Sequence, residues 1–451
     1  MYTRAFPYAI VCIVSASLAR AQPRPGDIGT NIFNIARRGL RGKAPVTADE
    51  EDFMFDPTYP RNEIKRILSK YKDAERIMHS ADEMVPVQQI FQMARSIEET
   101  VAVNALPSDV GTSGFDVKTA QMPLIDDIVG NLDVEYYGPL AMGTRKQRMT
   151  VDIDTGSADL WVPVACQDCP HPSYDAQGSD SYQTSGQAFE VTYGSGSVSG
   201  TLAQDRVAIG NLVIDEQYFG AVNQESQDFE DSPNDGLIGM AFSSIASSGQ
   251  PTFFENLIST NKIAAPLFSV HLTRTQSRGS QLCLGCFDSS KAKGAVTWVP
   301  VTSMTYWAVS MPGVMVNGQV AMSSGPVTAA IDTGTTLIYF PQALARSFYS
   351  KIPGSQQANQ YGDGFYTYPC NSQLTISLKL GPNTYAMNTA DFNLGRTSRS
   401  SNNCVGGILA MGGDFPSNLA IVGDEFLKSW YSVYDYSHGA RVGFAPSINN
   451  S

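Results

Sequence analysis

The sequence contains few charged residues, little histidine and no long apolar run beyond its first residues. Asp, Glu, Lys and Arg make up 16% of the 451 residues, and only 4 residues are histidine. After the first residues, no stretch of about 18 consecutive apolar residues occurs, so we expect no transmembrane helix. No apolar tail precedes Ser451, which argues against a lipid anchor of the glycosylphosphatidyl type. We therefore expect no stable membrane anchor.

The charge that is present is mainly negative and lies in the second part of the chain. Residues 22–121 carry 13 Lys and Arg against 15 Asp and Glu, whereas residues 122–451 carry 16 against 28. An acidic surface of this kind repels nucleic acid and anionic membranes, so we expect neither as a partner. A low working pH would relieve the self-repulsion, because carboxylates lose their charge in acid.

The first 21 residues have the pattern of a signal peptide. Arg4 supplies a positive charge, residues 5–18 are mostly apolar, and Ala19-Arg20-Ala21 offers a small-x-small cleavage site that makes Gln22 the new N-terminus. The alternative is a membrane anchor, but the run is short for spanning a bilayer. We expect a secreted, extracellular protein, with a vacuolar or lysosome-like compartment as the other possible destination.

Six cysteines remain once the signal peptide and its Cys12 are removed. An even number of cysteines in an exported chain indicates disulfides. The two Cys-x-x-Cys pairs could also be a zinc site, but the compartment is oxidising and no histidine cluster accompanies them. We expect disulfides and no metal or other cofactor. Six cysteines allow 15 pairings, which the sequence alone does not settle. They are Cys166, Cys169, Cys283, Cys286, Cys370 and Cys404.

Residues 22–121 differ in texture from the rest. Apolar residues recur at helical spacing from Ile64 to Met78 and again from Val87 to Val101, which predicts two amphipathic helices. Residues 104–121 are rich in Gly, Ser, Thr and Asp and are typical of a linker. Two interpretations remain open at this point. The segment is either a small helical domain or a prosegment that packs on the body and is later removed.

From about residue 122 the pattern changes to short strands between turns, so we expect a mostly β body. Residues 187–193 alternate and then meet the glycine-rich stretch 194–197, which predicts a hairpin. The clearest helical patches are residues 252–261 and 341–350.

A long internal repeat divides this body. Residues 151–163 and 329–341 share Ile-Asp-Thr-Gly and a final Pro at equivalent positions. An apolar-apolar-Gly motif follows each copy at a similar distance, at residues 237–239 and 421–423. Two weak motifs in the same order are unlikely to recur by chance. We expect two related lobes, at residues 122–292 and 293–451.

Each copy of Asp-Thr-Gly has the composition of a sharp turn that carries a carboxylate. Glycine permits backbone geometry and close approach that a Cβ would forbid. Ser157 and Thr335, three residues after Asp154 and Asp332, can donate hydrogen bonds to these aspartates. Two carboxylates within about 3 Å of each other share one proton, so one can act as a base while the other acts as an acid. A water between them could then attack an amide without a metal or a covalent intermediate.

These motifs make the body resemble the pepsin family over nearly all of residues 122–451, with fungal secreted members the most similar in motif. The resemblance rests on Asp154-Thr-Gly-Ser, Asp332-Thr-Gly-Thr, the Leu-Trp-Val after the first motif, the apolar-apolar-Gly motifs, and Tyr193-Gly-Ser-Gly. It implies an all-β, bilobal pepsin-like fold with a deep cleft, and a zymogen in which residues 22–121 form an inhibitory prosegment and linker.

The resemblance also implies residue roles. Asp154 and Asp332 are the implied catalytic residues of an aspartic endopeptidase that acts on protein and peptide substrates, and we expect a monomer. Tyr193 is the implied flap tyrosine, with Trp161 as its hydrogen-bond partner. The implied supporting residues are Gly156, Ser157, Gly334, Thr335 and Trp161, and the implied substrate-binding residues are Tyr193, Gly194 and Ser195.

We expect the disulfides Cys166–Cys169, Cys283–Cys286 and Cys370–Cys404, because short loops close at the lowest entropic cost. The last pair also resembles the disulfide common in the C-terminal lobe of the family. The pair Cys283–Cys286 requires a bend at Gly285, since these positions point to opposite faces of a straight strand.

Several other residues have two open interpretations. Phe242, Phe254 and Tyr306 are either pocket-lining or core residues. Asp152 could raise the proton affinity of the aspartate pair, although a solvated or hydrogen-bonded carboxylate is the expectation. Candidates for pairing a prosegment cation with the two aspartates are Lys70, Lys72 and Lys118.

The residues near the predicted site also bear on substrate preference and on two alternative functions. Ser195 offers no charge to a substrate lysine, so we expect cleavage between bulky apolar residues unless another carboxylate, such as Asp159, compensates. A non-catalytic pepsin-like protein would have a broken aspartate pair, and here both aspartates are present. A glycoside hydrolase needs two carboxylates but no twofold repeat.

Overall fold

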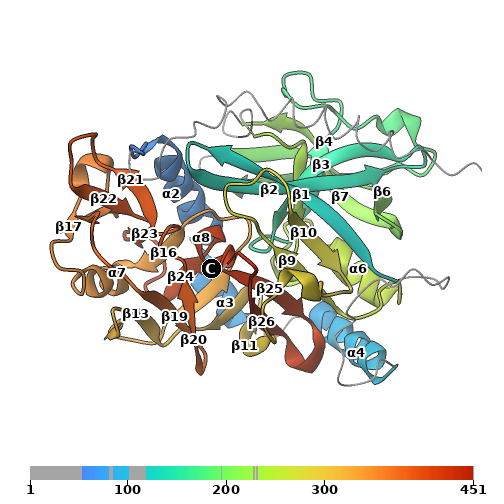
Figure 1. Ribbon diagram of the computed structural model, residues 1–451. Helices are drawn as coiled ribbons and strands as arrows, with labels where there is room; N and C mark the ends of the chain where they lie inside the picture. Colours follow the sequence, from blue (N-terminus) through green and yellow to red (C-terminus); the bar gives the residue numbers. More distant parts are fainter. Residues whose placement is uncertain are drawn as a thin grey trace, which may run out of the picture. The chain divides into compact units, whose positions relative to one another are not determined.

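The computed structural model describes residues 53–80, 85–100, 118–193, 196–226, 229 and 232–449 (Figure 1). Several predictions lie outside these residues: the signal peptide, most of the linker, and the flap residues Gly194 and Ser195. Within the described part of the chain, no helix is long and apolar enough to cross a membrane.

Three described helices lie between residues 53 and 100, where the sequence predicts two. The predicted helix from Ile64 to Met78 is interrupted at residues 72–73, where the backbone N–H of Lys72 bonds to the Ser69 carbonyl. Such i to i−3 bonds tighten a helix end without the Gly or Pro that would mark a break in the sequence. The helices are α2 (Thr58–Tyr71), α3 (Ala74–Ser80) and α4 (Val85–Thr100). We call residues 53–100 the N-terminal segment.

The first half of the body consists mainly of long antiparallel hairpins. The predicted hairpin at residues 187–197 is present, and Tyr193 pairs with Gly196 at its tip. The strands are β1 (Ala120–Val129), β2 (Leu132–Met142), β3 (Gln147–Asp154), β4 (Leu160–Pro163), β5 (Gln183–Tyr193), β6 (Gly196–Ile209), β7 (Leu212–Glu225), β8 (Gly236–Gly239), β9 (Leu267–His271) and β10 (Ser280–Leu284). Among these strands, β3 pairs in parallel with β8, and β4 pairs in parallel with β7. Helix α6 (Phe253–Ser259) begins with a capping box between Thr252 and Glu255, inside the predicted helical patch.

The second half is built of shorter strands and small sheets. Its strands are β11 (Thr297–Met304), β12 (Trp307–Ser310), β13 (Gly313–Val316), β14 (Gln319–Ala321), β15 (Thr328–Ile331), β16 (Ile338–Pro341), β17 (Gln356–Gln357), β18 (Tyr366–Pro369), β19 (Ile376–Leu380), β20 (Asn383–Met387), β21 (Asn393–Arg396), β22 (Asn403–Gly406), β23 (Ile408–Met411), β24 (Leu419–Val422), β25 (Trp430–Asp435) and β26 (Arg441–Pro446). Its helices are α7 (Gln342–Tyr349), which matches the second predicted patch, and α8 (Asp424–Leu427). Single 3-10 turns complete the described chain: η3 (Ala176–Gly178), η4 (Ser243–Ile245), η5 (Ser289–Lys291), η6 (Asn359–Tyr361) and η7 (Ser437–Gly439).

The internal repeat corresponds to two equivalent strand triplets. In the first half, β8 pairs in parallel with β3 and antiparallel with β4. In the second half, β24 pairs in parallel with β15 and antiparallel with β16. The registers also match, because Asp152 lies opposite Leu237 and its repeat equivalent Ala330 lies opposite Ile421. The fold is therefore the expected all-β, bilobal pepsin-like fold.

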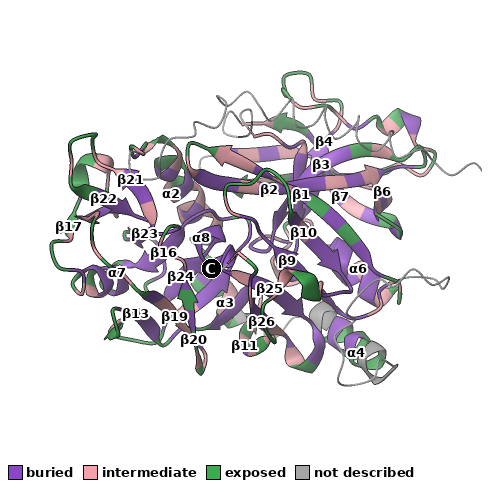
Figure 2. Cartoon of the chain, viewed as in Figure 1, coloured by how far each residue is buried: buried purple, intermediate pink, exposed green. Residues whose placement is uncertain are grey.

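A continuous antiparallel ladder joins the two halves beneath these triplets. Its strands follow one another in the order β1, β10, β9, β25, β26 and β11. The central strands are buried along most of their length, as Figure 2 shows for β24 and β25. Because β3 also has buried residues on both faces, the strand holds the loop that follows it in a fixed position.

Three disulfides lie in the body, with the pairings expected from loop length. They join Cys166 to Cys169, Cys283 to Cys286, and Cys370 to Cys404. Gly285 has a φ of 70°, which provides the bend between Cys283 and Cys286 that the sequence requires.

Candidate active site

The two Asp-Thr-Gly loops meet where the repeated strand triplets face each other. Asp154 is the last residue of β3, and Asp332 directly follows β15. The side chains of both aspartates are almost completely buried. We call Asp154 and Asp332 the aspartate pair.

The threonines of the two Asp-Thr-Gly motifs form hydrogen bonds between the loops. Thr155 Oγ1 donates a hydrogen bond to the Ile331 carbonyl at 2.9 Å and accepts one from the Thr333 backbone N–H at 3.0 Å. Thr333 Oγ1 makes the reciprocal contacts, to the Ile153 carbonyl and the Thr155 N–H. Each loop thus fixes the other, and the fully hydrogen-bonded network gives the aspartate pair one defined geometry.

Each carboxylate accepts two hydrogen bonds from its own loop. Asp154 accepts from the Gly156 N–H at 2.8 Å and from Ser157 Oγ at 2.6 Å. Asp332 accepts from the Gly334 N–H at 3.0 Å and from the Thr335 hydroxyl.

The glycines of the motif have a steric role. A Cβ on Gly156 would overlap the Asp332 carboxylate, and a Cβ on Gly334 would overlap the Asp154 carboxylate. Each loop therefore needs a glycine at this position so that the carboxylate of the other loop can approach.

An ammonium group from the N-terminal segment bridges the aspartate pair. Lys70 Nζ of α2 lies 2.8 Å from Asp154 Oδ1 and 2.9 Å from Asp332 Oδ2, and the Lys70 side chain is 9% exposed. The hydroxyl of Tyr71 donates a further hydrogen bond to Asp332 Oδ2 at 2.9 Å. The lysine and the tyrosine together occupy the space directly over both carboxylates.

The two carboxyl groups differ in proton affinity. Burial raises the pKa of Asp154 above its ordinary value, and the negative charge of Asp332 adds to this effect. Burial would also raise the pKa of Asp332, but the Lys70 ammonium and the hydrogen bonds from Asp154 and Thr335 outweigh it, so that this pKa is lowered. Burial opposes the charge of Lys70, yet the two carboxylates raise its pKa above the ordinary value. When the pair takes up a proton, Asp154 is therefore the favoured site.

The same helix is anchored behind the second loop by Glu63. Its buried carboxylate accepts hydrogen bonds from the backbone N–H of Thr336 at 2.6 Å, from that of Leu337 at 3.3 Å, and from Tyr339 OH at 2.7 Å. Tyr59 OH lies 2.8 Å from Thr336 Oγ1, one turn earlier on α2. Helix α2 thus contacts the aspartate pair and the second loop at the same time.

Strand β4 and the hairpin β5–β6 cover the other side of the site. Trp161 Nε1 donates to Tyr193 OH at 3.1 Å, which is the partnership implied by the resemblance. The ring of Phe229 packs edge-on against Trp161 and Tyr193, with centroid distances of 5.3 and 5.8 Å.

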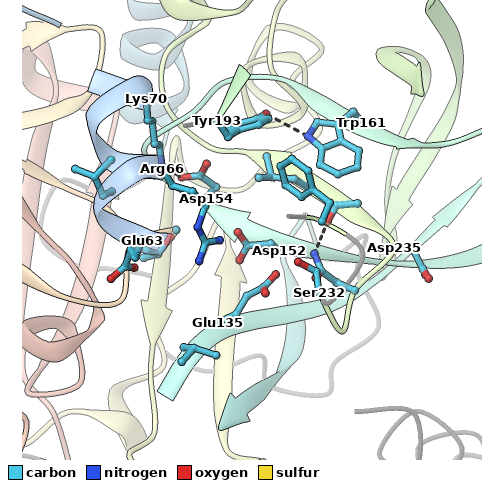
Figure 3. Close-up of a pocket in the computed structure, with 18 of the residues that line it drawn as sticks. Glu63, Arg66, Lys70, Glu135, Asp152, Asp154, Trp161, Tyr193, Ser232 and Asp235 are labelled. Carbon is cyan, nitrogen blue, oxygen red and sulfur yellow. Dashed lines mark hydrogen bonds and ion pairs between the residues drawn. The ribbon is translucent and has the colours of Figure 1, made fainter. Parts of the chain in front are cut away.

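A polar cavity of about 60 Å³ lies between α2 and the first half of the body. Figure 3 shows Asp154, Asp152 and Glu135 side by side along one wall, with Arg66 reaching toward them from α2. Trp161 and Tyr193 line the opposite side. The cavity is continuous with the aspartate pair and holds room for a few water molecules.

Comparison with known proteins agrees with this geometry. The family model of eukaryotic aspartyl protease matches residues 135–447. An aspartic protease of Phaffia rhodozyma is 40% identical over 322 residues, which cover 69% of this chain and 76% of that protein. Pepsin A of Rhinolophus ferrumequinum is 34% identical over 341 residues, which cover 73% of this chain and 85% of that protein.

The chain belongs to the eukaryotic aspartyl protease family. A second fungal relative, major aspartyl peptidase 1 of Cryptococcus neoformans var. grubii, is 34% identical over 343 residues, which cover 71% of this chain and 70% of that protein. This pepsin-like protein is an aspartic-type endopeptidase, and it hydrolyses peptide bonds of protein substrates.

The structure separates the open interpretations of the protease's aromatic residues. Phe242 and Phe254 are completely buried in the main core, where they pack against Trp307 and Phe268 respectively. With the N-terminal segment in place both are therefore core residues, although one of the rings near Phe242 is that of Phe91 in this segment. Tyr306 lies near the aspartate pair, with its ring centroid 4.9 Å from that of Tyr71.

Two of the three candidate lysines lie away from the aspartate pair. Lys72 is exposed, and Lys118 donates to the Asn261 carbonyl at 2.8 Å. Only Lys70 is on the face of α2 that meets the body, because Lys72 lies about 200° further round the helix.

The structure places Asp152 in the cavity beside Asp154, and its expected solvation or hydrogen bonding stays a prediction. The residue is 9% exposed, and its Oδ1 has no hydrogen-bond partner among the described residues. Alternation places Asp152 on the same face of β3 as Asp154, and the residues of both faces are buried from Met149 to Asp154.

The sequence reasoning missed Glu63, Arg66, Tyr71 and Glu135. A signal for the first two was present in the helical pattern. Tyr59, Glu63, Arg66 and Lys70 recur at spacings of three or four residues, so these polar side chains share one face of α2. Charged residues on the buried face of an amphipathic helix indicate a polar partner surface.

Proposed function

We propose that the protease is made as a latent precursor, in which residues 22 to about 119 form an inhibitory prosegment. The observation that carries the proposal is Lys70 Nζ within hydrogen-bond distance of both Asp154 and Asp332. A substrate carbonyl cannot reach the aspartate pair while this ammonium and the Tyr71 hydroxyl lie over it. Because β1 begins at Ala120, a cut before this residue keeps every pairing of β1, and we place the boundary two residues before the expected one.

We infer that Asp154 and Asp332 are the catalytic residues of the mature protease. One carboxylate deprotonates a water held between them while the other protonates the oxygen of the substrate amide. The loop hydrogen bonds from Gly156, Ser157, Gly334 and Thr335 support this role, because they fix both carboxylates without supplying a competing charge. When the C–N bond then breaks, the proton taken from the water passes to the leaving amine, and the substrate oxygen returns its proton to the pair.

We propose that the latency of the precursor is relieved by acid. The pKa of Asp332 is lowered from its ordinary value of 3.8 while Lys70 is in place. A lowered carboxyl pKa stabilises the closed precursor above the ordinary value, and this contribution is lost as the pH falls through the lowered value. Self-processing should therefore speed up below about pH 4.

For substrate preference we propose bulky apolar residues on both sides of the bond that is cut, with the hairpin tip from Tyr193 to Ser195 closing over them. Asp159 is not available to pair with a substrate lysine, because it accepts hydrogen bonds from the Ser247 and Ser248 N–H groups at 2.7 and 3.0 Å. In digests of a peptide library at acid pH, lysine should be rare immediately before the cut bond. Efficient cutting there would contradict this preference.

Replacement of either aspartate tests the proposed roles. In Asp154→Asn or Asp332→Asn, with the prosegment removed by an unrelated protease because the variant cannot process itself, peptide hydrolysis should fall below detection, because an amide cannot exchange the shared proton. Asp363→Asn, at an exposed position, is the matched control and should leave the rate unchanged. A well-folded single variant of the aspartate pair that still cuts peptides would overturn the assignment, and an inactive wild-type protein would favour a non-catalytic role.

We propose secretion, or delivery to a vacuolar or lysosome-like compartment, on the basis of the N-terminal signal pattern, and a monomeric protein. These proposals predict Gln22 as the first residue of the exported precursor, which N-terminal sequencing checks.

A further inference from the structure

The cavity beside the aspartate pair contains a buried carboxylate that the proposed mechanism does not use. Asp152 points into the cavity next to Asp154, and its Oδ1 has no hydrogen-bond partner among the described residues. Glu135, a half-buried residue on the adjacent strand β2, adds a second carboxylate to the same wall. A buried polar group without a partner is unfavourable, so the arrangement points to a partner that arrives from outside the body.

In the precursor, a cation from the N-terminal segment faces these carboxylates. The guanidinium of Arg66 extends from α2 toward Asp152 and Glu135, as Figure 3 shows. Its positive charge interacts with Glu63 of the same helix and with Glu135, and its Cζ lies 5.4 Å from the centroid of the Tyr59 ring. The guanidinium group leaves the cavity if α2 is removed, whereas both carboxylates belong to the body and remain.

We propose that in the mature protease Asp152 and Glu135 form a pocket for a basic substrate side chain, preferably arginine, about two residues from the bond that is cut. The proposal rests on the proposed removal of the prosegment. Arginine is favoured over lysine because its planar fork of donors can contact two carboxylates at once and is more weakly hydrated than an ammonium.

Two distances indicate which substrate residue reaches the pocket: the one between Arg66 and Lys70 on α2, and the one between Asp152 and Asp154 on β3. Arg66 precedes Lys70 by four residues, which is about 6 Å along a helix. Asp152 precedes Asp154 by two residues, which is about 7 Å along a strand. An extended peptide advances about 3.3 Å per residue, so either spacing corresponds to about two substrate residues.

The pocket exists on only one side of the aspartate pair. The repeat equivalent of Asp152 is Ala330, which is apolar and buried. We therefore expect the preference for arginine at one substrate position and not at the position related to it by the twofold repeat. This preference differs from the one at the cut bond itself, where apolar residues are proposed.

The charge state of the pocket depends on its occupant. In the precursor, burial raises the pKa of Glu135 to about 8 and also raises that of Asp152, so both carboxyl groups take up protons readily in acid. A bound guanidinium stabilises the ionised carboxylates, and the preference should become stronger as the pH rises within the active range. Beyond Arg66 and Lys70, the titratable groups that interact with these carboxylates are Tyr59 of α2 and, in the body, Asp127, Tyr137, Asp154, His171, Asp332 and Asp424.

A peptide series on the processed wild-type enzyme tests the pocket. All peptides carry the same apolar residue on each side of the cut bond. Arginine, citrulline or norleucine is placed, one position at a time, at each of the next positions outward on either side. At one position about two residues from the cut, arginine should raise kcat/KM about tenfold over norleucine, the scale of one charge-assisted hydrogen bond. Citrulline keeps the shape of arginine without its charge and should lose this advantage.

Two variants then assign the effect to the pocket. In Asp152→Asn and in Glu135→Gln, the ratio of kcat/KM for the arginine and norleucine peptides should fall to below about twofold. Glu216→Gln, at an exposed site on β7, is the matched control and should keep the wild-type ratio.

The outcomes separate this proposal from the proposed function. If the norleucine peptides are cut but arginine gives no advantage at any position, the pocket proposal alone is overturned. The same holds if citrulline matches arginine, or if the advantage survives in both variants. If no peptide is cut, the proposed function fails and the pocket proposal fails with it.

Discussion

Helices α2 and α4 both belong to the N-terminal segment, but they contact the body in opposite ways. Helix α2 places polar and charged side chains on buried partners, with Lys70 on the aspartate pair and Glu63 behind the second loop. Helix α4 uses apolar residues, and Ile90, Phe91 and Ala94 join the main core. The ring of Phe91 lies 5.8 Å from that of Tyr436 and 6.2 Å from that of Phe242.

This difference assigns two separate roles to the N-terminal segment: α2 covers the aspartate pair, and α4 attaches the segment to the body. The contacts of α2 depend on ionised carboxylates, so they respond to protonation. The contacts of α4 depend on buried apolar area, which does not change with pH. One segment can therefore release the aspartate pair in acid while it stays attached elsewhere, which would keep it close to the site for cleavage.

Of the changes proposed here to the N-terminal segment, removal of the Lys70 ammonium should have the largest effect on the latency of the precursor. In a Lys70→Met precursor, the aspartate pair loses its buried partner, and docking of α2 should weaken by about 3 kcal/mol, or roughly a hundredfold. Cleavage of a fluorogenic peptide by the precursor at about pH 6 should rise accordingly.

Lys65→Met is the matched control, because Lys65 is an exposed lysine of the same helix. It should leave the precursor latent. A Lys70→Met precursor that remains as latent as the wild type would show that the ion pair does not block the site.

A smaller effect is expected from Phe91→Ala on α4. Loss of the ring should weaken docking of α4 by about 2 kcal/mol, below the range for a fully enclosed core phenylalanine because Phe91 lies at the edge of the core. The loss should be the same at acid and near-neutral pH, and limited proteolysis of α4 measures it. Met93→Ala changes a residue that is 42% exposed and should have little effect. A strong dependence of the Phe91→Ala effect on pH would contradict the assignment of an apolar contact to α4.

The sequence predicted best those features that depend on residues close together in the chain or on a repeated motif. The repeated Asp-Thr-Gly motifs predicted two equivalent loops, and the strand triplets around Asp154 and Asp332 have equivalent registers. The predicted helix near 252–261 was also recognisable, since Thr252 and Glu255 form a local capping box.

What escaped prediction depends on contacts between distant parts of the chain. Glu63 is separated from Thr336 by 273 residues, and no local pattern states that the two meet. Alternation along β3 also does not reveal that Asp152 lines a cavity together with residues of α2. The break between α2 and α3 likewise has no local breaker residue, and it follows from the position that Tyr71 takes against Asp332.

In this account, α2 covers the aspartate pair and is released in acid, whereas the contacts of α4 with the body do not depend on pH. Hydrogen exchange of the full-length precursor tests it directly, with labelling pulses short enough to precede processing and with rates corrected for the intrinsic effect of pH. As the pH falls below the ordinary Asp332 pKa of 3.8, protection of the α2 amides should fall while that of the amides from Ile90 to Ala94 is retained. Loss of protection in both helices together, or in α4 before α2, would contradict the account.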